Sequence, residues 1–199
     1  MSTTKPRPVL PHLETARLTL RPRVMADLEA CLAMDGDPAV AQFVAGPWAD
    51  PAQHRAFVEA RILTDYPPGL GYWSITSRLA PSRFLGWILL IPCDSRGADA
   101  AIEIGWRVIR AARGLGYATE AAAAVLQHAF STLDLDEVIA EIHPENMPSL
   151  SVARKIGLQS IGLVPMDPAM PNGGIPVLRH LLTRAAFVIR TDTGRHTQR

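Results

Sequence analysis

The segment best suited to bind a ligand is a glycine-rich turn, Arg113-Gly114-Leu115-Gly116-Tyr117-Ala118, between a predicted strand and a predicted helix. Gly114 and Gly116 allow a tight turn because glycine has no Cβ that would clash. The first N–H groups of a helix have no partner within it. Together with the positive end of the helix dipole, they suit a phosphate or pyrophosphate. Arg110 and Arg113 add positive charge nearby.

Other nucleotide-binding motifs do not fit this turn. It lacks the Gly-Lys-Ser/Thr sequence of a Walker loop. Gly114 and Gly116 are not followed by the third glycine of a dinucleotide fingerprint, because Glu120 and Ala121 stand where it would fall. Taken alone, the turn could also be a strand-to-helix connection that binds nothing.

A carboxylate that could act as a base lies on the strand before the turn. Apolar residues alternate with other residue types along 101–109. The apolar residues are Ile102, Ile104, Trp106 and Val108, and the residues between them are Glu103, Gly105 and Arg107. The period of two places Glu103 on the face opposite the apolar side chains. A carboxylate in that position could serve as a general base, or it could be a surface or salt-bridged glutamate.

Cysteine and histidine give weaker signals. Cys31 and Cys93 form no CxxC pair, and no Cys/His cluster has zinc-ligand spacing, so no metal is expected. Buried thiols are favoured over a disulfide. His143 ends a predicted strand and could be structural or catalytic. Cys93 as an acyl-accepting nucleophile lacks a nearby base in the sequence.

The elements that position these residues predict a mixed α/β sheet in one domain. Predicted strands are 16–21, 72–77, 84–91, 101–109, 138–142, 158–164 and 177–183, and predicted helices are 27–34, 51–63, 119–131 and 148–156. Asp50 and Pro51 suit the start of the second helix. Gly36-Asp37-Pro38 is expected to end the first. Flexible tails, 1–11 and 191–199, are expected to flank a domain at 12–190.

Composition narrows the function. The chain has 199 residues, 48% hydrophobic and 20% charged, which is typical of a globular domain. A net charge of +1 without a dense basic block argues against nucleic-acid binding. No signal-peptide pattern and no apolar run of ~20 residues is present. A soluble, cytoplasmic protein without a membrane partner is therefore expected.

Several motifs then point to one family. Arg113-x-x-Gly116-x-Ala118 resembles the Arg/Gln-x-x-Gly-x-Gly/Ala motif of the GNAT superfamily of N-acetyltransferases. Five further segments resemble the ribosomal-protein-alanine acetyltransferase-like branch of this superfamily: residues 14–21, 37–40, 85–88, 103–108 and 114–121. The last helix of that branch is resembled by the motif Asn146-x-x-Ser149-x-x-Val152-x-x-Lys155-x-Gly157-Leu158. The resemblance covers about residues 13–184. Each motif is weak by itself, but their order and spacing together are specific.

The resemblance implies a GNAT-like fold, a mostly antiparallel sheet flanked by helices. Its two central parallel strands, 101–109 and 138–142, would be splayed to bind acetyl-CoA. The implied cofactor contacts come from Trp106 and Val108 for the pantetheine arm, from Arg113, Gly114, Leu115, Gly116, Tyr117 and Ala118 for the pyrophosphate, and from Asn146. Relatives often carry Lys or Arg at the position of Leu115, and Arg110 could offset the missing charge.

The implied reaction is direct attack of a primary amine on the thioester of acetyl-CoA. Amines attack when neutral, and reference pKa values of ~7.7–8.0 for α-amines and ~10.4 for lysine make a general base useful. Glu103 is our candidate, acting directly or through water. Many members use a tyrosine on the last helix to stabilise the leaving thiolate, but none follows Tyr117. Ser149 matches the serine of the branch, Ser151 competes with it, and Ser149 could instead cap the helix.

The sequence does not identify the acceptor, which could be a protein N-terminus or a small-molecule amine. In this branch two loops shape the acceptor cleft. Here they are residues 43–50, with Phe43 and Trp48, and 165–176, with Met166, Asp167 and Met170. A monomer and a homodimer both stay open. Two functions of other classes also stay open. One is a non-catalytic acyl-CoA-binding sensor on the same fold. The other is a nucleic-acid-associated module, and the near-neutral net charge argues against this second alternative.

Overall fold

The computed structural model describes residues 10–44, 46–93, 101–166 and 174–196, with side chains as far as residue 190. Its strands are β1 (Leu13–Glu14), β2 (Leu18–Pro22), β3 (Gly71–Ser77), β4 (Ala80–Pro92), β5 (Ile102–Val108), β6 (Glu137–Ile142), β7 (Gln159–Val164) and β8 (Val177–Thr183). Its α-helices are α1 (Leu28–Asp35), α2 (Pro38–Ala41), α3 (Pro51–Leu63), α4 (Tyr117–Ser131), α5 (Met147–Ile156) and α6 (Arg184–His196). Short 3-10 helices, η1 (Met25–Asp27) and η3 (Arg110–Ala112), precede α1 and follow β5.

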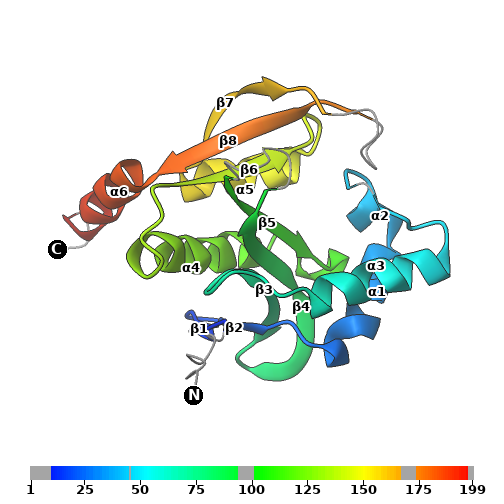
Figure 1. Cartoon of the computed structure of the whole chain (residues 1–199). Coiled ribbons are helices and arrows are strands. Elements are labelled where there is room, and N and C mark those ends of the chain that lie inside the picture. The colour runs from blue at the N-terminus through cyan, green and yellow to red at the C-terminus, as the bar shows by residue number, and fades with distance from the viewer. Residues whose placement is uncertain (1–9, 45, 94–100, 167–173, 197–199) are drawn as a thin grey trace, which may run out of the picture.

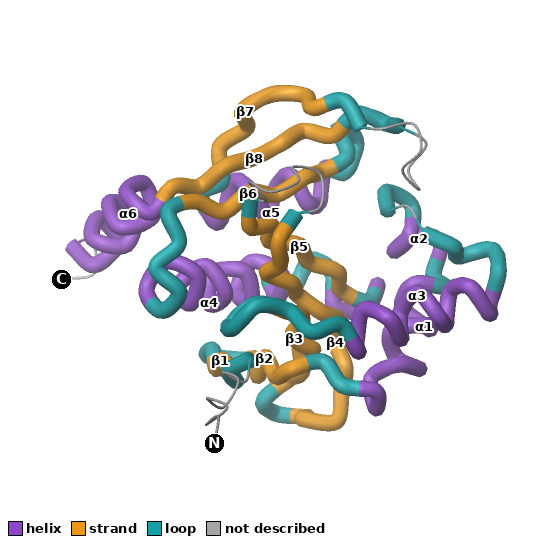
Figure 2. The backbone as a smooth tube through the Cα atoms, viewed as in Figure 1, coloured by secondary structure: helices purple, strands orange, loops and turns teal. Residues whose placement is uncertain are grey.

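In the described part of the chain the strands form one sheet in the order β1-β2-β3-β4-β5-β6-β8-β7. Neighbouring strands are antiparallel, except that β5 and β6 run parallel. Figure 1 shows β5 near the middle of the fold, with α4 and the α1–α3 group on either side, and Figure 2 shows the same layers as a tube. The predicted fold class, a mostly antiparallel sheet with one central parallel pair and flanking helices, is confirmed.

The two faces of β5 pack against different helices, as its alternation predicts. Ile104 is buried in the main core with α4 side chains such as Val125, and the other apolar residues of β5 pack against that core. On the opposite face a smaller cluster joins Leu28 and Cys31 of α1, Val58 of α3 and Trp87 of β4. Trp87 lies opposite Arg107 in the ladder. Glu103, Gly105 and Arg107 therefore face the α1–α3 side.

The start of α3 agrees with the sequence, whereas the start of α2 was missed. The Asp50 carboxylate accepts hydrogen bonds from the N–H groups of Ala52 and Gln53, at 2.9 and 3.0 Å. Residues 36–38 do end α1, but the same residues also open a short helix. Asp37 accepts the Ala39 N–H at 2.9 Å, and Pro38 takes the first position of α2. An aspartate followed by proline caps a helix as readily as it interrupts one.

The C-terminal segment also differs from the prediction. We expected a tail from residue 191, but α6 begins at Arg184 and continues to His196. Ala186 and Phe187 pack against the main core, and the Phe187 ring lies 4.9 Å from that of Phe130. A helix anchored by such tertiary contacts can extend through polar residues whose own helix propensity is low. The sequence analysis predicted β2 but missed β1, which pairs with it, because β1 has only 2 residues.

A buried polar cluster fixes the chain between β2 and η1. The Asp27 carboxylate accepts hydrogen bonds from the Arg21 guanidinium at 2.7 and 2.5 Å and from the Ser74 hydroxyl at 2.8 Å. Burial alone would raise the pKa of Asp27, but these bonds and one from the Val24 N–H outweigh it and lower the pKa overall. Asp27 therefore stays ionised in the fold and holds η1 against β3.

None of the helices in the described ranges is both long enough and apolar enough to cross a bilayer.

Candidate active site

The predicted phosphate-binding turn is shaped by two glycines with left-handed backbone conformations. Gly114 has φ 75° and Gly116 has φ 80°, values that residues with a Cβ rarely adopt. Gly116 is the N-cap of α4, and no side chain provides a cap hydrogen bond there. The first helical bond joins the Glu120 N–H to the Gly116 carbonyl at 3.0 Å. The preceding N–H groups of α4 therefore have no partner within the helix, and the helix dipole adds positive potential.

A cavity of about 460 Å³, which we call the cofactor cavity, opens over this turn. Its lining includes eight of the nine residues predicted to bind the cofactor: Trp106, Val108, Arg113, Gly114, Gly116, Tyr117, Ala118 and Asn146. Leu115 is the exception. Its side chain is 51% exposed, and its carbonyl accepts a hydrogen bond from Arg17 Nη1 at 3.0 Å. The Leu115 side chain points to solvent, so the absence of a cation at this position leaves the cavity lining unchanged.

Positive charge at the cofactor cavity comes from a residue that the sequence analysis did not assign to the site. Lys155 on α5 lines the cavity together with Arg113. Arg110, which we expected to compensate for Leu115, instead lies 3.5 Å from the Asp37 carboxylate at the start of α2. The motif around α5 contained Lys155, and its spacing from Asn146 was the available signal. Its position beside α4 depends on tertiary packing.

The two parallel strands part where the cofactor cavity begins. Pairing between β5 and β6 is confined to Glu103 opposite Ile139, although β5 continues to Val108 and β6 to Ile142. On its other side β5 follows β4 closely. At Gly86, φ is 147° and a Cβ would lie 2.1 Å from the Arg107 carbonyl oxygen, so only glycine fits. This confirms the predicted divergence of the two central strands, which leaves backbone groups of β5 without a strand partner on the β6 side.

A second cavity of about 410 Å³, the acceptor cavity, lies on the α1–α3 side of β5. Glu103 lines it, as do Phe43, Trp48 and Met166 from the two loops expected to shape the acceptor site. Asp167 and Met170, which we named with them, lie outside the described residues. The acceptor and cofactor cavities share six lining residues, Phe43, Val44, Trp106, Arg107, Asn146 and Ser149. The two cavities therefore meet at the open end of the β5–β6 pair.

Ser149 lies at this meeting point without capping α5. Asn146 is the N-cap, and its Oδ1 accepts the Ser149 N–H at 3.2 Å. The alternative interpretation of Ser149 as the helix cap is therefore wrong, because Asn146 makes the capping bond. Ser151 lines only the cofactor cavity. Asn146 lines both cavities, and its Oδ1 is already used to start the helix.

A buried ion pair beneath the meeting point was missed. Arg107 donates to the Asp35 carboxylate, both side chains being less than 8% exposed, and His54 Nε2 lies 3.5 Å from the same carboxylate. The Arg107 guanidinium also lies 5.0 Å and 5.4 Å from the ring centres of Trp87 and Trp48. The alternation in β5 placed Arg107 on the same face as Glu103, but its buried partner lies 72 residues away in sequence.

The weaker candidates also border the acceptor cavity. His143 lines it, and its Nδ1 accepts the Glu145 N–H at 3.1 Å while its ring packs 5.1 Å from Phe43. A neutral His143 therefore carries its proton on Nε2. Cys93 lines the cavity, and Cys31 belongs to the α1–α3 cluster with Val58, which also lines it. Both cysteines are buried and neither forms a disulfide. Burial raises the pKa of Cys31 to about 11, although Arg23 partly opposes this.

In the described part of the chain no three His, Cys, Asp or Glu side chains cluster as metal ligands.

Comparison with known proteins agrees with this geometry. Residues 17–159 match the family model of the acetyltransferase (GNAT) domain. The chain therefore belongs to the GNAT acetyltransferase family. It is 32% identical over 158 residues to an FsC-acetyl coenzyme A-N(2)-transacetylase of Aspergillus fumigatus, covering 76% of this chain and 66% of that protein.

Solved structures show the same fold. A GNAT-family acetyltransferase from Bacillus anthracis superposes with a TM-score of 0.73 at 23% identity, over 88% of this chain and 99% of that one. A spermidine N-acetyltransferase from Vibrio cholerae, solved with CoA and spermine, gives a TM-score of 0.69 at 15% identity, over 87% of this chain and 99% of that one. At these identities the likeness is one of architecture.

Proposed function

We propose that this protein transfers an acetyl group from acetyl-CoA to a primary amine, of a small molecule or a protein N-terminus. The observation that carries the proposal is the junction of two cavities at Ser149 and Asn146. One cavity is built over an uncapped helix N-terminus, and the other contains a carboxylate, Glu103. Family membership and the name of the Aspergillus relative, an acetyl coenzyme A-dependent transacetylase, support the same reaction. The assignment to the ribosomal-protein-alanine acetyltransferase-like branch stays a prediction from the motifs.

The residues that line the cofactor cavity suit an acyl-CoA in their charge and in their position along β5. We infer that the pyrophosphate contacts the N–H groups around Gly116 and Tyr117, with Arg113 and Lys155 supplying positive charge at the same cavity. The pantetheine arm would then follow β5 past Val108 and Trp106, where the edge of β5 is not paired with β6. This path leads the thioester to the junction beside Ser149.

The reaction follows from the groups at the junction. The amine nitrogen attacks the thioester carbonyl carbon, a C–N bond forms, the C–S bond breaks, and the amine loses a proton. We assign acceptance of that proton to Glu103, directly or through water, because it is the carboxylate of the β5 face that borders the acceptor cavity. The departing thiolate would receive a hydrogen bond from the Ser149 hydroxyl, which borders both cavities.

A screen of amines for CoA release tests the proposal, with acetyl-CoA affinity measured separately by calorimetry. Acetyl-CoA-dependent thiol release with at least one class of primary amine is the expected outcome. Tight acetyl-CoA binding without thiol release for any amine would instead identify a non-catalytic sensor on the same fold. Absence of acetyl-CoA binding would contradict both functions.

A further inference from the structure

The acceptor cavity contains buried guanidinium groups whose hydrogen bonds are not all satisfied. Among the described residues, three buried side-chain polar atoms lack a hydrogen-bond partner: Nε and Nη2 of Arg23 and Nε of Arg107. Both arginines line the acceptor cavity. Arg107 is partnered by Asp35, whereas Arg23 forms no ion pair with any residue that the structure describes. Arg23 is only 8% exposed, so the unsatisfied donors belong to a side chain more than nine-tenths buried.

The groups around Arg23 compensate its charge only in part. The Asp35 carboxylate favours the charged form of Arg23, but this carboxylate is already paired with Arg107. Its guanidinium stacks 3.8 Å from the ring centre of Tyr72 and lies beside the thiol of Cys31. Burial raises the pKa of Cys31 to about 11 and that of Tyr66 to about 12, so neither group carries a negative charge at neutral pH. Burial lowers the pKa of Arg23 itself, but an arginine stays protonated in proteins. A buried cation with unsatisfied donors is costly, which makes the site ready for an anion.

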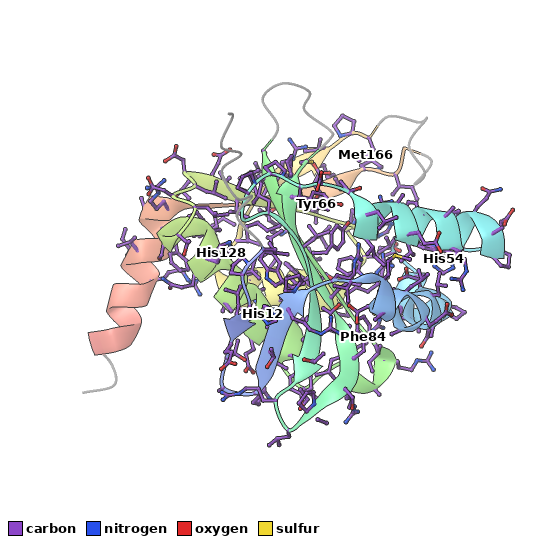
Figure 3. All side chains as sticks on the ribbon, turned by 60° about the horizontal axis from the view of Figure 1, so that its bottom comes forward. His12, His54, Tyr66, Phe84, His128 and Met166 are labelled. Atoms are coloured by element: carbon purple, nitrogen blue, oxygen red, sulfur yellow. The ribbon has the colours of Figure 1, made fainter. Side chains whose placement is uncertain are left out.

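The unsatisfied atoms have the arrangement that a carboxylate requires. Nε and Nη2 form one edge of the planar guanidinium, and their N–H bonds point in parallel. This edge matches the two oxygens of a carboxylate in a bidentate pair. A third cavity of about 700 Å³, which we call the outer cavity, adjoins the acceptor cavity at Arg23, Arg61 and Tyr72. Figure 3 labels Tyr66, which lines the outer cavity, and Met166, which lines the acceptor cavity.

The ladder places Arg23 on the same sheet face as the reacting groups, at the far end of a row. The Arg23 N–H bonds the Tyr72 carbonyl at 2.9 Å, Tyr72 lies opposite Leu89, and Leu89 lies opposite Gly105 on β5. Residues opposite one another in an antiparallel ladder share a face, and all four line the acceptor cavity. Three strand spacings separate Gly105 from Arg23, roughly 14 Å.

The charged groups that line the acceptor cavity differ between its two ends. At the junction Arg107 is paired with Asp35. Glu103 and Glu141 border the end nearest the junction, where Glu141 is held by Arg179 Nε at 2.9 Å. Arg23 lies at the other end, with the exposed Arg61 beside it. We propose that the acceptor is an amine that also carries a carboxylate, separated from the amine by a chain of several atoms, and that Arg23 binds this carboxylate. An α-amino acid is too short, because its amine and carboxylate share one carbon. The inference rests on the proposed acetyl transfer and names its acceptor class.

Kinetics on matched acceptors test this inference. The ω-amino acids from 3-aminopropanoate to 8-aminooctanoate are compared with n-alkylamines of the same length. We expect kcat/KM to favour the longer amino acids at least ~10-fold, since a hydrogen bond to a charged group contributes that much or more. Arg23→Met should abolish this preference. Arg23→Lys should reduce it, because an ammonium group cannot form the bidentate pair of a guanidinium. Arg83→Met is the control and should retain the preference, since Arg83 is exposed and lines neither the acceptor cavity nor the outer cavity.

Stability separates binding from a structural role. Arg23→Met removes a buried charge with unsatisfied donors, so its melting temperature should equal or exceed that of the parent. If Arg23→Met fails to fold, Arg23 is structural, and the preference is then measured in Arg23→Lys. Equal kcat/KM for amino acids and alkylamines, or a preference that survives both Arg23 substitutions, would overturn the proposal.

Equilibrium binding distinguishes this inference from the proposed function. Trp48 and Trp87 line the acceptor cavity, so binding of 8-aminooctanoate can be followed by tryptophan fluorescence. Binding that depends on Arg23, without acetyl transfer to any amine, would support the carboxylate site and contradict the acetyltransferase. Acetyl transfer to amines at the same rate with and without a carboxylate would support the acetyltransferase and contradict the carboxylate site. Absence of both binding and transfer would contradict both.

Discussion

Ser149 borders both the acceptor cavity and the cofactor cavity, whereas Ser151, two residues further along α5, borders only the cofactor cavity. The two hydroxyls therefore differ in their access to the junction where a thioester and an amine would meet. Because the N-cap of α5 is Asn146, loss of the Ser149 hydroxyl should leave the start of the helix intact.

The first prediction follows from this difference. Ser149→Ala should lower kcat with little change in KM for acetyl-CoA, because charge builds on sulfur only as the C–S bond breaks. The loss can reach ~10²-fold, and less if water replaces the hydroxyl. Ser151→Ala is the matched control and should retain kcat. Steady-state kinetics with thermal melts of both variants checks this. A larger loss of kcat in the Ser151 variant would show that the wrong serine is assigned.

Glu103 is expected to affect turnover but not cofactor binding, because it borders the acceptor cavity alone. Glu103→Gln should lower kcat by up to ~10²–10⁴-fold, most strongly at lower pH, where more of the amine arrives protonated. The affinity for acetyl-CoA should match the parent in calorimetry. Glu137→Gln, at an exposed position that borders neither cavity, is the control. A pH–rate profile identical to the parent's would exclude a role as base.

The turn before α4 predicts a selective loss of acetyl-CoA affinity. Gly116→Trp should weaken binding ~10-fold or more, because it obstructs N–H groups whose hydrogen bonds to a charged ligand are each worth ~1.5–3 kcal/mol. At φ 80° the substitution also costs ~1–2 kcal/mol of stability.

Gly162→Trp on β7 controls for this backbone strain. Gly162 has φ 118°, an added Cβ would meet nothing within 4 Å, and the residue lies outside both cavities. It should lose stability without losing affinity. Calorimetry on both folded variants decides the matter, and an unchanged affinity in Gly116→Trp would rule out pyrophosphate binding at this turn.

Asp27 predicts a specific dependence of stability on pH. Its pKa in the fold is lower than in the unfolded chain, where it is ~3.9, so its contribution is present above that value and is lost as pH falls through the folded pKa. Asp27→Asn should destabilise the protein by about 1.5–3 kcal/mol at neutral pH, because it weakens charge-assisted hydrogen bonds to Arg21, whose side chain is partly exposed. Its unfolding free energy should also fall less steeply than the parent's below about pH 4.

Denaturant melts from pH 3 to 7 measure both effects. Asp136→Asn is the control, since the Asp136 side chain is 99% exposed and its pairing with Arg184 should contribute no more than ~1 kcal/mol. Equal stability of Asp27→Asn and the parent at neutral pH would mean that this cluster does not hold η1 in place.

The sequence by itself determined the local conformation of the turn before α4 and the face of β5 that carries Glu103. Gly114 and Gly116 before an alanine-rich helix predicted the turn, since glycine adopts φ near 80° without the cost that a Cβ adds. The alternation around Glu103 predicted which face of β5 it occupies. Asp50 and Pro51 predicted the start of α3 to the residue. These signals are local, because turns, caps and strand faces depend on neighbours within a few residues.

Only the tertiary structure decided which distant groups share the acceptor cavity. The pairing of Arg107 with Asp35 and the burial of Arg23 against Tyr72 join segments tens of residues apart, through strand register and the packing of α1 and α3. The fold likewise decided that Asn146, not Ser149, caps α5, and that α6 continues past residue 190. Burial and pairing of charge depend on what the fold brings alongside a side chain, so a single sequence does not specify them by its local pattern.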